Sequence, residues 1–317
     1  MNKKHKIIII GFGSIGRRHY KNLCQLGFKD VYVYDIDKKR IVGKDIKTVP
    51  DIKHKNLAQF DVAFICSPSS AHIKTALQCA KAGCHLFIEK PLSCSVAHIN
   101  ELQKLCKKNK LVAMVACNYL FHKGLIALLR ILKSDLYGKP LLSRFVMGYS
   151  IPVHRKYIYA AQKKYRNETL VLDSGSHIMN CLVALFGDIK NGFIYRSKIS
   201  SLGIKSEESA AMVFEHKRGV LSTVALDYVS RKRAQSIDAV TDKGTLTIDF
   251  MDDLVKFENE SKSKVLYRGD GDSNKMFVDE IKHFFECVEQ RQKPLQDLND
   301  GKRIIEILLK ASAPRRV

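Results

Sequence analysis

Three side chains of the sequence have the types and spacing that proton transfer requires. Asp173 and His177 are four positions apart, so a helix would place both on one face, one turn apart. A carboxylate beside an imidazole raises the pKa of the imidazole toward the range of a general base and fixes its tautomer. Lys90 stands between Glu89 and Pro91, and the proline biases the lysine backbone toward an extended conformation that presents its side chain reproducibly. Each feature also has a purely structural interpretation, in which Asp173 caps a helix, His177 packs and Lys90 is a solvated loop lysine.

A second group of residues has the spacing of a dinucleotide-binding loop and reads Gly11-Phe12-Gly13-Ser14-Ile15-Gly16. Gly11 permits a tight turn, Gly13 lets the backbone approach a pyrophosphate, and Gly16 lets a helix pack against the preceding strand. The pyrophosphate would sit on the helix N-terminus, where N–H groups and the helix dipole favour an anion. Asp35, 19 positions after Gly16, can accept hydrogen bonds from ribose hydroxyls and repel a 2′-phosphate, which favours NAD over NADP. The basic run at 38–40 could bind a 2′-phosphate, so NADP remains an alternative cofactor. For the glycine motif itself, the alternative interpretation is a glycine-rich turn that binds no ligand.

The elements that would carry these residues alternate between strand and helix in the first part of the chain. Apolar, β-branched runs predict buried strands at 6–10, 30–34, 61–66, 85–89 and 112–117. Helical spacing predicts helices at 17–26, 71–82 and 95–109. Strands that alternate with helices across short turns indicate βαβ units and a parallel sheet. Lys90 then follows a strand at the carboxyl edge of that sheet, where ligands bind in open α/β folds.

After about Asn118 the pattern becomes that of an α+β domain. We expect helices at 122–134, 174–186, 276–290 and 301–311. A strand at 140–149 and successive strands from 192 to 268, separated by turn signals such as Asp242-Lys243-Gly244, predict a mostly antiparallel sheet. A length of 317 residues, at roughly 100–200 residues per domain, also favours two domains. The predicted fold class is therefore α/β, with an N-terminal Rossmann parallel sheet and a C-terminal α+β domain.

The composition narrows the class of protein. The sequence has 54 Lys and Arg and 32 Asp and Glu, which gives a net charge of +22. The basic residues are dispersed in short pairs, without an aromatic–basic motif. Solvated surfaces explain such a charge better than a nucleic-acid interface does. Nine cysteines without a C-x-x-C pair fit reduced, buried thiols better than disulfides or a metal site. No stretch reaches the roughly 18–20 apolar residues that span a bilayer, and the N-terminal apolar run is too short for a secretory signal. We therefore expect a cytoplasmic protein with no metal and no nucleic-acid or membrane partner.

The motifs occur in an order that resembles one enzyme family. That order is Gly11-x-Gly13-x-x-Gly16 with Arg17 and His19, Ser67-Pro68-x-x-x-His72, Glu89-Lys90-Pro91, Asn118, and Asp173-x-x-x-His177. It resembles the glucose–fructose oxidoreductase / inositol dehydrogenase (Gfo/Idh/MocA) family from Lys6 to about Ser312. The resemblance implies an NAD(P)-binding Rossmann domain over 1–120. It also implies a second domain over 121–317 whose open, mostly antiparallel sheet binds substrate and supports a homodimer or homotetramer, and whose C-terminal helix could pack back on the first domain.

The same resemblance assigns roles to individual residues. Lys90 and His177 would handle the substrate hydroxyl, either of them as the principal acid or base, and Asp173 would support positioning or proton transfer. The implied cofactor contacts are Gly11, Gly13, Ser14, Ile15, Gly16, Asp35, Ser67, Pro68, His72, Glu89, Lys90 and Asn118.

Departures from the family pattern concern the substrate. Residues 118–121 read Asn-Tyr-Leu-Phe where relatives often read Asn-x-Arg-Phe, and 166–169 lack the glycines that many relatives have there. The basic and aromatic segment from Pro152 to Arg166 looks like that of relatives in bacterial surface-glycan and sialic-acid-like sugar pathways. Its basic and aromatic residues would suit a phosphorylated or nucleotide-linked sugar. A source organism whose proteins are generally rich in lysine explains the basic residues equally well.

We therefore expect an NAD(P)-dependent oxidoreductase that acts on CH–OH groups. It would transfer a hydride between a carbinol carbon of a sugar, polyol or sugar nucleotide and the nicotinamide ring. Two alternatives share the fold: a redox-neutral NAD-dependent glycosidase that oxidises a sugar carbon transiently, and a non-catalytic dinucleotide-sensing protein. The presence of all three residues that the resemblance assigns to catalysis argues against the sensing protein, and a nucleic-acid binder has only the net charge in its favour.

Overall fold

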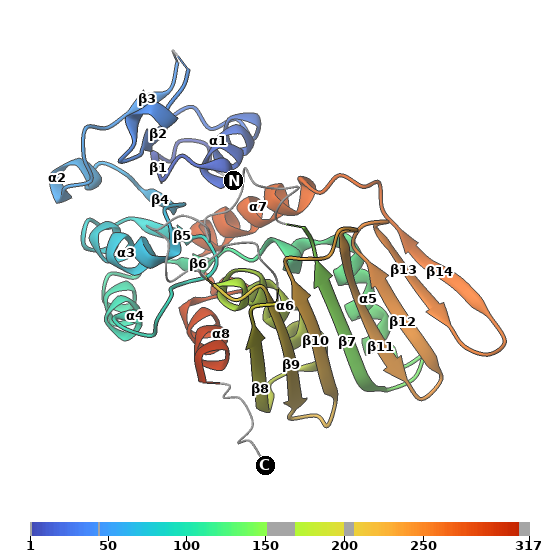
Figure 1. The fold of residues 1–317 in the computed structure, drawn as a ribbon. Helices are drawn as coiled ribbons and strands as arrows, with labels where there is room; N and C mark the ends of the chain where they lie inside the picture. The colour runs from blue at the N-terminus through green and yellow to red at the C-terminus, as the bar shows by residue number, and fades with distance from the viewer. Residues whose placement is uncertain (1, 44, 151–168, 200–205, 311–317) are drawn as a thin grey trace. The chain divides into compact units, whose positions relative to one another are not determined.

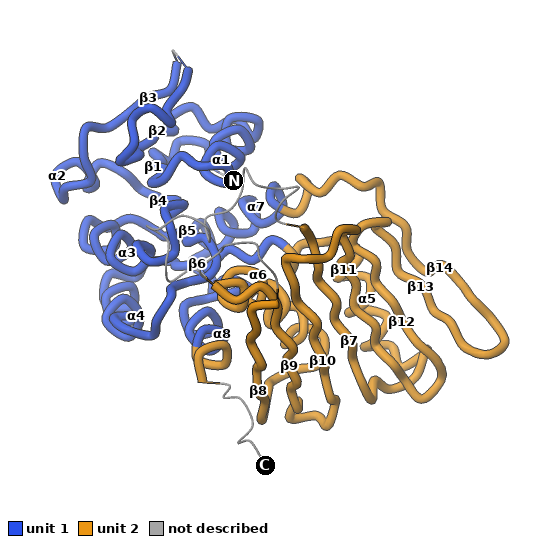
Figure 2. Tube along the Cα trace, viewed as in Figure 1, with its two compact units in different colours: residues 1–118, 277–305 blue, residues 119–276, 306–317 orange. Residues whose placement is uncertain are grey.

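The structure is a computed structural model that describes residues 2–43, 45–150, 169–199 and 206–310. The chain divides into two compact units, which Figure 2 shows in separate colours. One unit comprises Met1–Asn118 and Phe277–Ile305, and the other comprises Tyr119–Met276 and Glu306–Val317. Among the described residues, no helix combines the length and the apolar character that crossing a bilayer requires.

The first unit is built on a six-stranded parallel sheet with the strand order β3-β2-β1-β4-β5-β6 (Figure 1). Its strands are β1 (Ile7–Ile10), β2 (Val31–Tyr34), β3 (Lys47–Thr48), β4 (Val62–Ile65), β5 (His85–Ile88) and β6 (Ala113–Val115). The four residues of β1 are at most 3% exposed, because a central parallel strand is covered on both faces. The chain crosses from one side of β1 to the other between β3 and β4, and ligands of such sheets bind at the carboxyl edge beside this switch in strand order. The parallel Rossmann sheet predicted from the sequence is thus confirmed.

The helices of the first unit follow its strands, and two of them begin elsewhere than predicted. They are α1 (Ser14–Gln25), α2 (His54–Leu57), α3 (His72–Lys81), α4 (Ile99–Lys108) and most of α7 (Lys275–Gln290), with the 3₁₀ turns η1 (Lys38–Arg40) and η2 (Ser69–Ala71). α1 begins at Ser14 instead of Arg17, because the helix starts inside the glycine motif with Gly13 as its N-cap. α4 begins at Ile99 instead of near 95, because His98 before it has a φ of 60°, which is left-handed and cannot continue a helix.

Aromatic side chains join the C-terminal part of the first unit to its sheet. Phe64 of β4 and Phe87 of β5 stack with their ring centroids 4.4 Å apart. Phe284 of α7 meets both rings edge-on, at 5.9 Å from Phe64 and 5.4 Å from Phe87. All three residues are 0% exposed. A helix that follows β6 by 160 residues therefore completes the core of the N-terminal sheet.

The second unit has an eight-stranded sheet with the order β14-β13-β12-β11-β7-β10-β9-β8 (Figure 1). Its strands are β7 (Pro140–Gly148), β8 (Ile189–Ser197), β9 (Ser209–His216), β10 (Leu221–Asp227), β11 (Ala234–Thr241), β12 (Gly244–Asp249), β13 (Leu254–Glu258) and β14 (Ser263–Arg268). The β7–β10 pair is parallel and the other neighbouring pairs are antiparallel, which confirms the mostly antiparallel sheet. Alternate residues of β11 are buried, as a sheet with one covered face requires.

Two helices cover that face of the second sheet. α5 (Lys123–Lys133) packs on β12, β13 and β14, and α6 (Leu170–Phe186) packs on β9 and β10. α6 begins at Leu170, four residues before the predicted start, because the Thr169 hydroxyl accepts a hydrogen bond from the Leu172 amide at 3.2 Å and caps the helix. α8 (Leu298–Lys310) is the last helix of the described chain.

Candidate functional site

The loop between β1 and α1 leaves no room for side chains at two of its glycines. Gly11 has a φ of 99°, and a Cβ atom there would lie 2.5 Å from the backbone of Cys66, just after β4. A Cβ atom at Gly16 would lie 2.0 Å from the carbonyl oxygen of Gly11. α1 begins at Ser14 with Gly13 as its N-cap, and no side chain of the described residues caps this end. The loop is therefore tightly packed and presents a helix N-terminus that suits a pyrophosphate.

Asp35 follows β2, and backbone amides hold both oxygens of its carboxylate. Oδ2 accepts a hydrogen bond from the Phe12 amide at 2.6 Å, and Oδ1 accepts one from the Asp37 amide at 2.8 Å. Asp35 is 6% exposed, so these bonds fix the carboxylate between the glycine loop and the turn after β2. Each oxygen keeps a further lone pair, which can accept a hydrogen bond from a ribose hydroxyl. In the basic run nearby, Arg40 is already paired, with its Nε 3.5 Å from Oδ2 of Asp37.

His72 connects the turn after β4 to the loop that carries Lys90. Its Nε2 lies 2.7 Å from the carbonyl oxygen of Ser67, and its Nδ1 lies 2.9 Å from that of Pro91. His72 is 1% exposed, and this burial lowers the pKa of the imidazole although both carbonyl contacts act to raise it. Because a neutral ring carries one N–H, it donates to one of the two carbonyl oxygens at a time. The Lys90–Pro91 peptide bond in this loop is cis.

Glu89, the residue before Lys90, is buried against α1. Its Oε1 lies 2.6 Å from Nε2 of His19, and the two residues are 8% and 0% exposed. The His19 ring in turn lies among the rings of Phe64 and Phe87, with centroids 5.6 and 5.0 Å away. A hydrogen bond to a carboxylate is stronger in such an apolar setting than in water. The backbone on either side of Lys90 is thus anchored, while the lysine itself is half-buried.

Asp173 and His177 lie on α6 in the second unit, one helical turn apart and both half-buried. Since Thr169 is the N-cap, Asp173 stands inside the first turn, where the helix dipole favours a carboxylate. The His177 ring meets the ring of Tyr119 edge-on, with the centroids 4.7 Å apart. The Tyr119 hydroxyl donates to Oε1 of Gln235 on β11 at 3.1 Å. The sheet therefore fixes the tyrosine ring against which His177 packs.

Sequence reasoning missed two tyrosines beside Asp173. β7 and β10 are paired in parallel with Gly148 opposite Asp227, so the residues that follow them, Tyr149 and Tyr228, meet with ring centroids 5.1 Å apart. Tyr228 is 4% exposed, and burial first, then the neighbouring Tyr149 and Asp173, raise the pKa of its phenol well above the usual range. A tyrosine directly after each of two strands was the available signal. It could be used only with knowledge that the two strands pair.

The predicted site residues divide between the two units. The first unit contains the predicted cofactor contacts, and it brings the glycine loop, Asp35, the Ser67 turn and the Glu89-Lys90 loop into the contacts described above. Asn118, 8% exposed, begins the 3₁₀ turn η3 (Asn118–Phe121) at the end of that unit's first segment. Asp173 and His177 belong to the second unit. The segment from Pro152 to Arg166, which the sequence relates to sugar specificity, lies outside the described residues.

Comparison with known proteins gives matches in both units. Residues 5–117 match a family model described as "Oxidoreductase family, NAD-binding Rossmann fold" (GFO_IDH_MocA), and residues 126–247 match the GFO/IDH/MocA C-terminal domain. The sequence is 24% identical over 315 residues to myo-inositol 2-dehydrogenase of Thermotoga maritima, covering 94% of this chain and 92% of that protein. An oxidoreductase from Agrobacterium radiobacter, solved with NAD⁺, L-tartaric acid and magnesium, has a similar fold, with a TM-score of 0.84, 16% identity and coverage of 99% of this chain and 97% of that one. UDP-N-acetylglucosamine 3-dehydrogenase from Acidithiobacillus ferrooxidans is similar with a TM-score of 0.78, 16% identity and coverage of 97% and 96%.

Proposed function

The chain belongs to the Gfo/Idh/MocA family of NAD-binding oxidoreductases, and from this premise we propose that it interconverts a secondary alcohol and a ketone on a polyol, sugar or sugar nucleotide. The observation that carries the proposal is the contact of His72 with both Ser67 and Pro91, at 2.7 and 2.9 Å. It ties the turn after β4 to the loop of Lys90 at the carboxyl edge of the sheet, where dinucleotides bind in this fold. The relatives support the substrate class, since one is a myo-inositol dehydrogenase and another a UDP-N-acetylglucosamine dehydrogenase.

The residues have distinct roles in the proposed reaction. The glycine loop and Asp35 would hold NAD, which would supply the acceptor for the hydride from the carbinol carbon. The ammonium group of Lys90 donates a hydrogen bond to the hydroxyl oxygen and stabilises the negative charge that develops on it. His177 takes the hydroxyl proton as general base and releases it to water, and Asp173 orients the imidazole. In the reverse direction the same imidazole returns the proton to the oxygen.

The cofactor side of the proposal rests on groups that are already organised. The uncapped start of α1 would receive the pyrophosphate, and the carboxylate of Asp35 would accept the ribose hydroxyls. A carboxylate held in this position also repels a 2′-phosphate, so we propose NAD as the preferred dinucleotide. Ser67, Pro68 and Glu89 would border the nicotinamide half.

Nicotinamide absorbance tests the reaction directly. We further propose a role in the metabolism of bacterial surface-glycan sugars. Purified protein is therefore assayed with NAD or NADP against a panel of inositols, aldoses and nucleotide-linked sugars. Lys90→Ala should lower turnover by about 10²–10³-fold, the usual effect of removing a donor to a developing oxyanion, with NAD affinity nearly unchanged. Lys74→Ala, an exposed lysine of α3, is the control. An equal loss of turnover and NAD affinity in Lys90→Ala would contradict the proposed role.

We also propose that the enzyme works in the cytoplasm as a homo-oligomer formed through the second sheet. Strand register places Tyr195, Ala211, Ala225 and Val146 in one row across β8, β9, β10 and β7. Tyr195 is 58% and Val146 38% exposed, and both alanines are exposed, so the row lies on the face away from α5 and α6. A row of small and apolar side chains on an exposed sheet face suits packing against a second copy. Sedimentation should show a dimer or tetramer, and Ala225→Arg should yield a monomer that still binds NADH.

A further inference from the structure

The first unit buries a carboxyl group that the proposed mechanism does not use, that of Glu280 on α7. The residue is 0% exposed. Its Oε1 accepts a hydrogen bond from the amide of Cys117, just after β6. Its Oε2 is also buried and has no hydrogen-bond partner among the described residues. Because an ionised carboxylate with one unpaired oxygen is strongly disfavoured in such a place, this geometry indicates a protonated carboxyl group.

Glu280 lies at the carboxyl edge of the sheet beside Glu89. β5 and β6 are neighbouring strands, and the Ala116 amide donates to the Ile88 carbonyl oxygen at 2.7 Å. Glu89 and Cys117 are the next residues along these two strands. Burial, and secondarily the charge of Glu89, raise the pKa of Glu280 well above its usual range, against the opposing effect of the Cys117 amide.

Contacts at both ends of α7 hold Glu280 in this position. Near the start of the helix, the ring of Phe277 meets that of His19, the partner of Glu89, with centroids 6.3 Å apart. Beyond the end of the helix, the Val115 amide of β6 donates to the Gln296 carbonyl oxygen at 2.9 Å. The segment that carries Glu280 therefore contacts both α1 and β6, the two elements that flank the Glu89-Lys90 loop.

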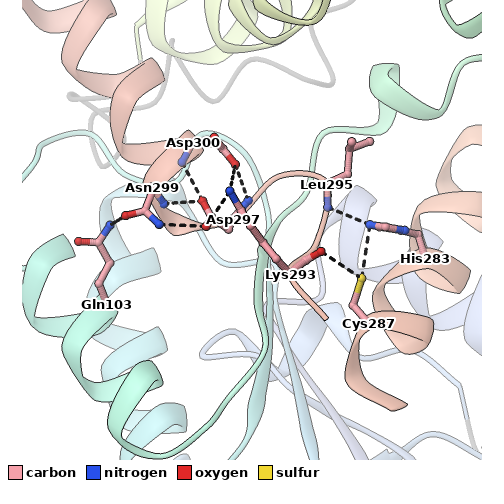
Figure 3. A network of polar contacts seen from close by, with 8 residues as sticks. All are labelled: Gln103, His283, Cys287, Lys293, Leu295, Asp297, Asn299 and Asp300. Atoms are coloured by element: carbon pink, nitrogen blue, oxygen red, sulfur yellow. Dashed lines mark hydrogen bonds and ion pairs between the residues drawn. The ribbon is translucent and has the colours of Figure 1, made fainter. Parts of the chain in front are cut away.

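The polar network in Figure 3 fixes the chain between α7 and α8. The Leu295 amide donates to Nε2 of His283 on α7 at 2.9 Å, and the Cys287 sulfur lies 3.5 Å from the same nitrogen. Gln103 of α4 donates to the side-chain oxygen of Asn299 on α8 at 2.9 Å. α7 is thereby tied through the following loop to the helices of the first unit.

We propose that Glu280 is a positioning residue for Lys90, and that it acts as a neutral carboxyl group through Glu89 and the Cys117 amide. With a proton on Glu280, this carboxyl group adds no negative charge beside Glu89, and Glu89 keeps its contact with His19. The other titratable groups around Glu280 and Glu89 are His19, Cys66, His72 and Lys90. Loss of the Glu280 acceptor would release the end of β6 beside Glu89 and let the Lys90 loop move. The proposal rests on the catalytic role of Lys90 proposed above.

Three variants separate a positioning role from simple packing. E280Q keeps an acceptor for the Cys117 amide and is permanently neutral, so we expect its kcat to remain within about threefold of wild type. E280A removes the acceptor, and we expect kcat to fall at least tenfold while the affinity for NADH, which depends on Asp35 and the glycine loop, changes less than threefold. E286Q makes the same chemical change at an exposed position of α7 and should change neither quantity. If E280A does not fold, E280D takes its place, because its shorter side chain withdraws the acceptor.

Infrared spectroscopy tests the proton without a substrate. The wild-type spectrum at neutral pH should contain a carbonyl band of a protonated carboxyl group that is absent in E280Q and present in E286Q. A spectrum of E280Q identical to wild type in this region would overturn the proposal, as would an E280Q enzyme impaired as severely as E280A. Full turnover in E280A with an inactive Lys90→Ala variant would refute the role of Glu280 alone. Full turnover in Lys90→Ala would instead refute the proposed function of Lys90, and with it the role of Glu280 as its positioning residue.

Discussion

The carboxylate of Asp35 offers a sharp test of the cofactor site, because the protein uses both of its oxygens before any ligand binds. The Phe12 amide donates to Oδ2 at 2.6 Å and the Asp37 amide to Oδ1 at 2.8 Å. Asp35→Asn changes one atom of the side chain, yet both protein neighbours are N–H donors. The amide can turn its oxygen toward only one of them, and its NH₂ group must then face the other. We therefore expect this substitution to lower both the free energy of unfolding and the affinity for NADH, although it changes the size of the side chain very little.

The magnitude follows from the two bonds and the exposure of the site. Leaving a buried N–H group unsatisfied costs about 1–3 kcal/mol, and Asp35 is 6% exposed, so we expect a loss of that size in the free energy of unfolding. The ribose hydroxyls also lose a charged acceptor, which contributes about 1.5–3 kcal/mol, or roughly 10–150-fold in Kd for NADH. NADPH should lose much less, because the repulsion between the carboxylate and its 2′-phosphate disappears with the charge.

Calorimetric titration with NADH and NADPH, together with urea denaturation, measures these effects. Asp37→Asn is the matched control, since it makes the same change two residues away on an exposed side chain that contacts the Lys39 amide and Arg40. It should leave both dinucleotide affinities within about twofold, as expected for an exposed position whose contacts contribute little. Equal losses of NADH and NADPH affinity in Asp35→Asn would refute the idea that this carboxylate selects between the two dinucleotides. Unchanged stability would refute the argument from the two amide donors.

Two further predictions concern titrating groups in the body of the protein. Burial raises the pKa of the Cys84 and Cys181 thiols to about 12 and that of Cys106 to about 11, whereas Cys24 is exposed, so alkylation of the folded protein should reach Cys24 first. Mass spectrometry that finds the three buried thiols modified before unfolding would contradict this. Desolvation lowers the pKa of histidines at 72, 85, 122, 216 and 283, so the unfolded chain binds protons that the folded chain resists. As the pH falls below about 6.5, the free energy of unfolding should decrease. The fully buried His72 alone should contribute up to about 1.4 kcal/mol per pH unit to this decrease. A urea midpoint that stays constant from pH 7 to pH 5 would refute this prediction.

The strands of the first sheet could be predicted because their signal is local. A run such as Ile7–Ile10 is apolar at every position, and only a strand covered on both faces accommodates it. Helix starts were less predictable, because they depend on caps as well as on periodicity. At α6 the cap is visible in the sequence, because Thr169 stands directly before an apolar run, and an N-cap at this position predicts the observed start. At α4 the start depends on the left-handed conformation of His98, which histidine favours too weakly for the sequence alone to predict it.

Long-range arrangements could not be predicted from periodicity. The pattern of a segment indicates which face is buried but not which partner buries it, so the parallel pairing of β7 with β10 and the return of α7 to the first sheet had no local sign. Glu280 is an instructive case. It stands in the apolar stripe formed by Phe277, Ile281 and Phe284, and a carboxyl group at such a position indicates either a misjudged helix face or a buried polar contact. Its distance of 163 residues from Cys117 hides which of these applies.

Buried polar groups in the first unit are concentrated where its loops must be held. Phe64 and Phe87 in the middle of the sheet are surrounded by apolar and aromatic side chains. Asp35 and Glu89, in contrast, lie directly after β2 and β5, and His72 begins α3 after the turn that follows β4. Each of these three contacts a backbone group or a histidine ring of a neighbouring loop or helix. Burying such groups is unfavourable unless they are paired, so their positions mark the points where the backbone around the cofactor loops must not move. By this reasoning a substitution at any of them should affect ligand binding or turnover more than an equally buried apolar substitution that costs the same stability.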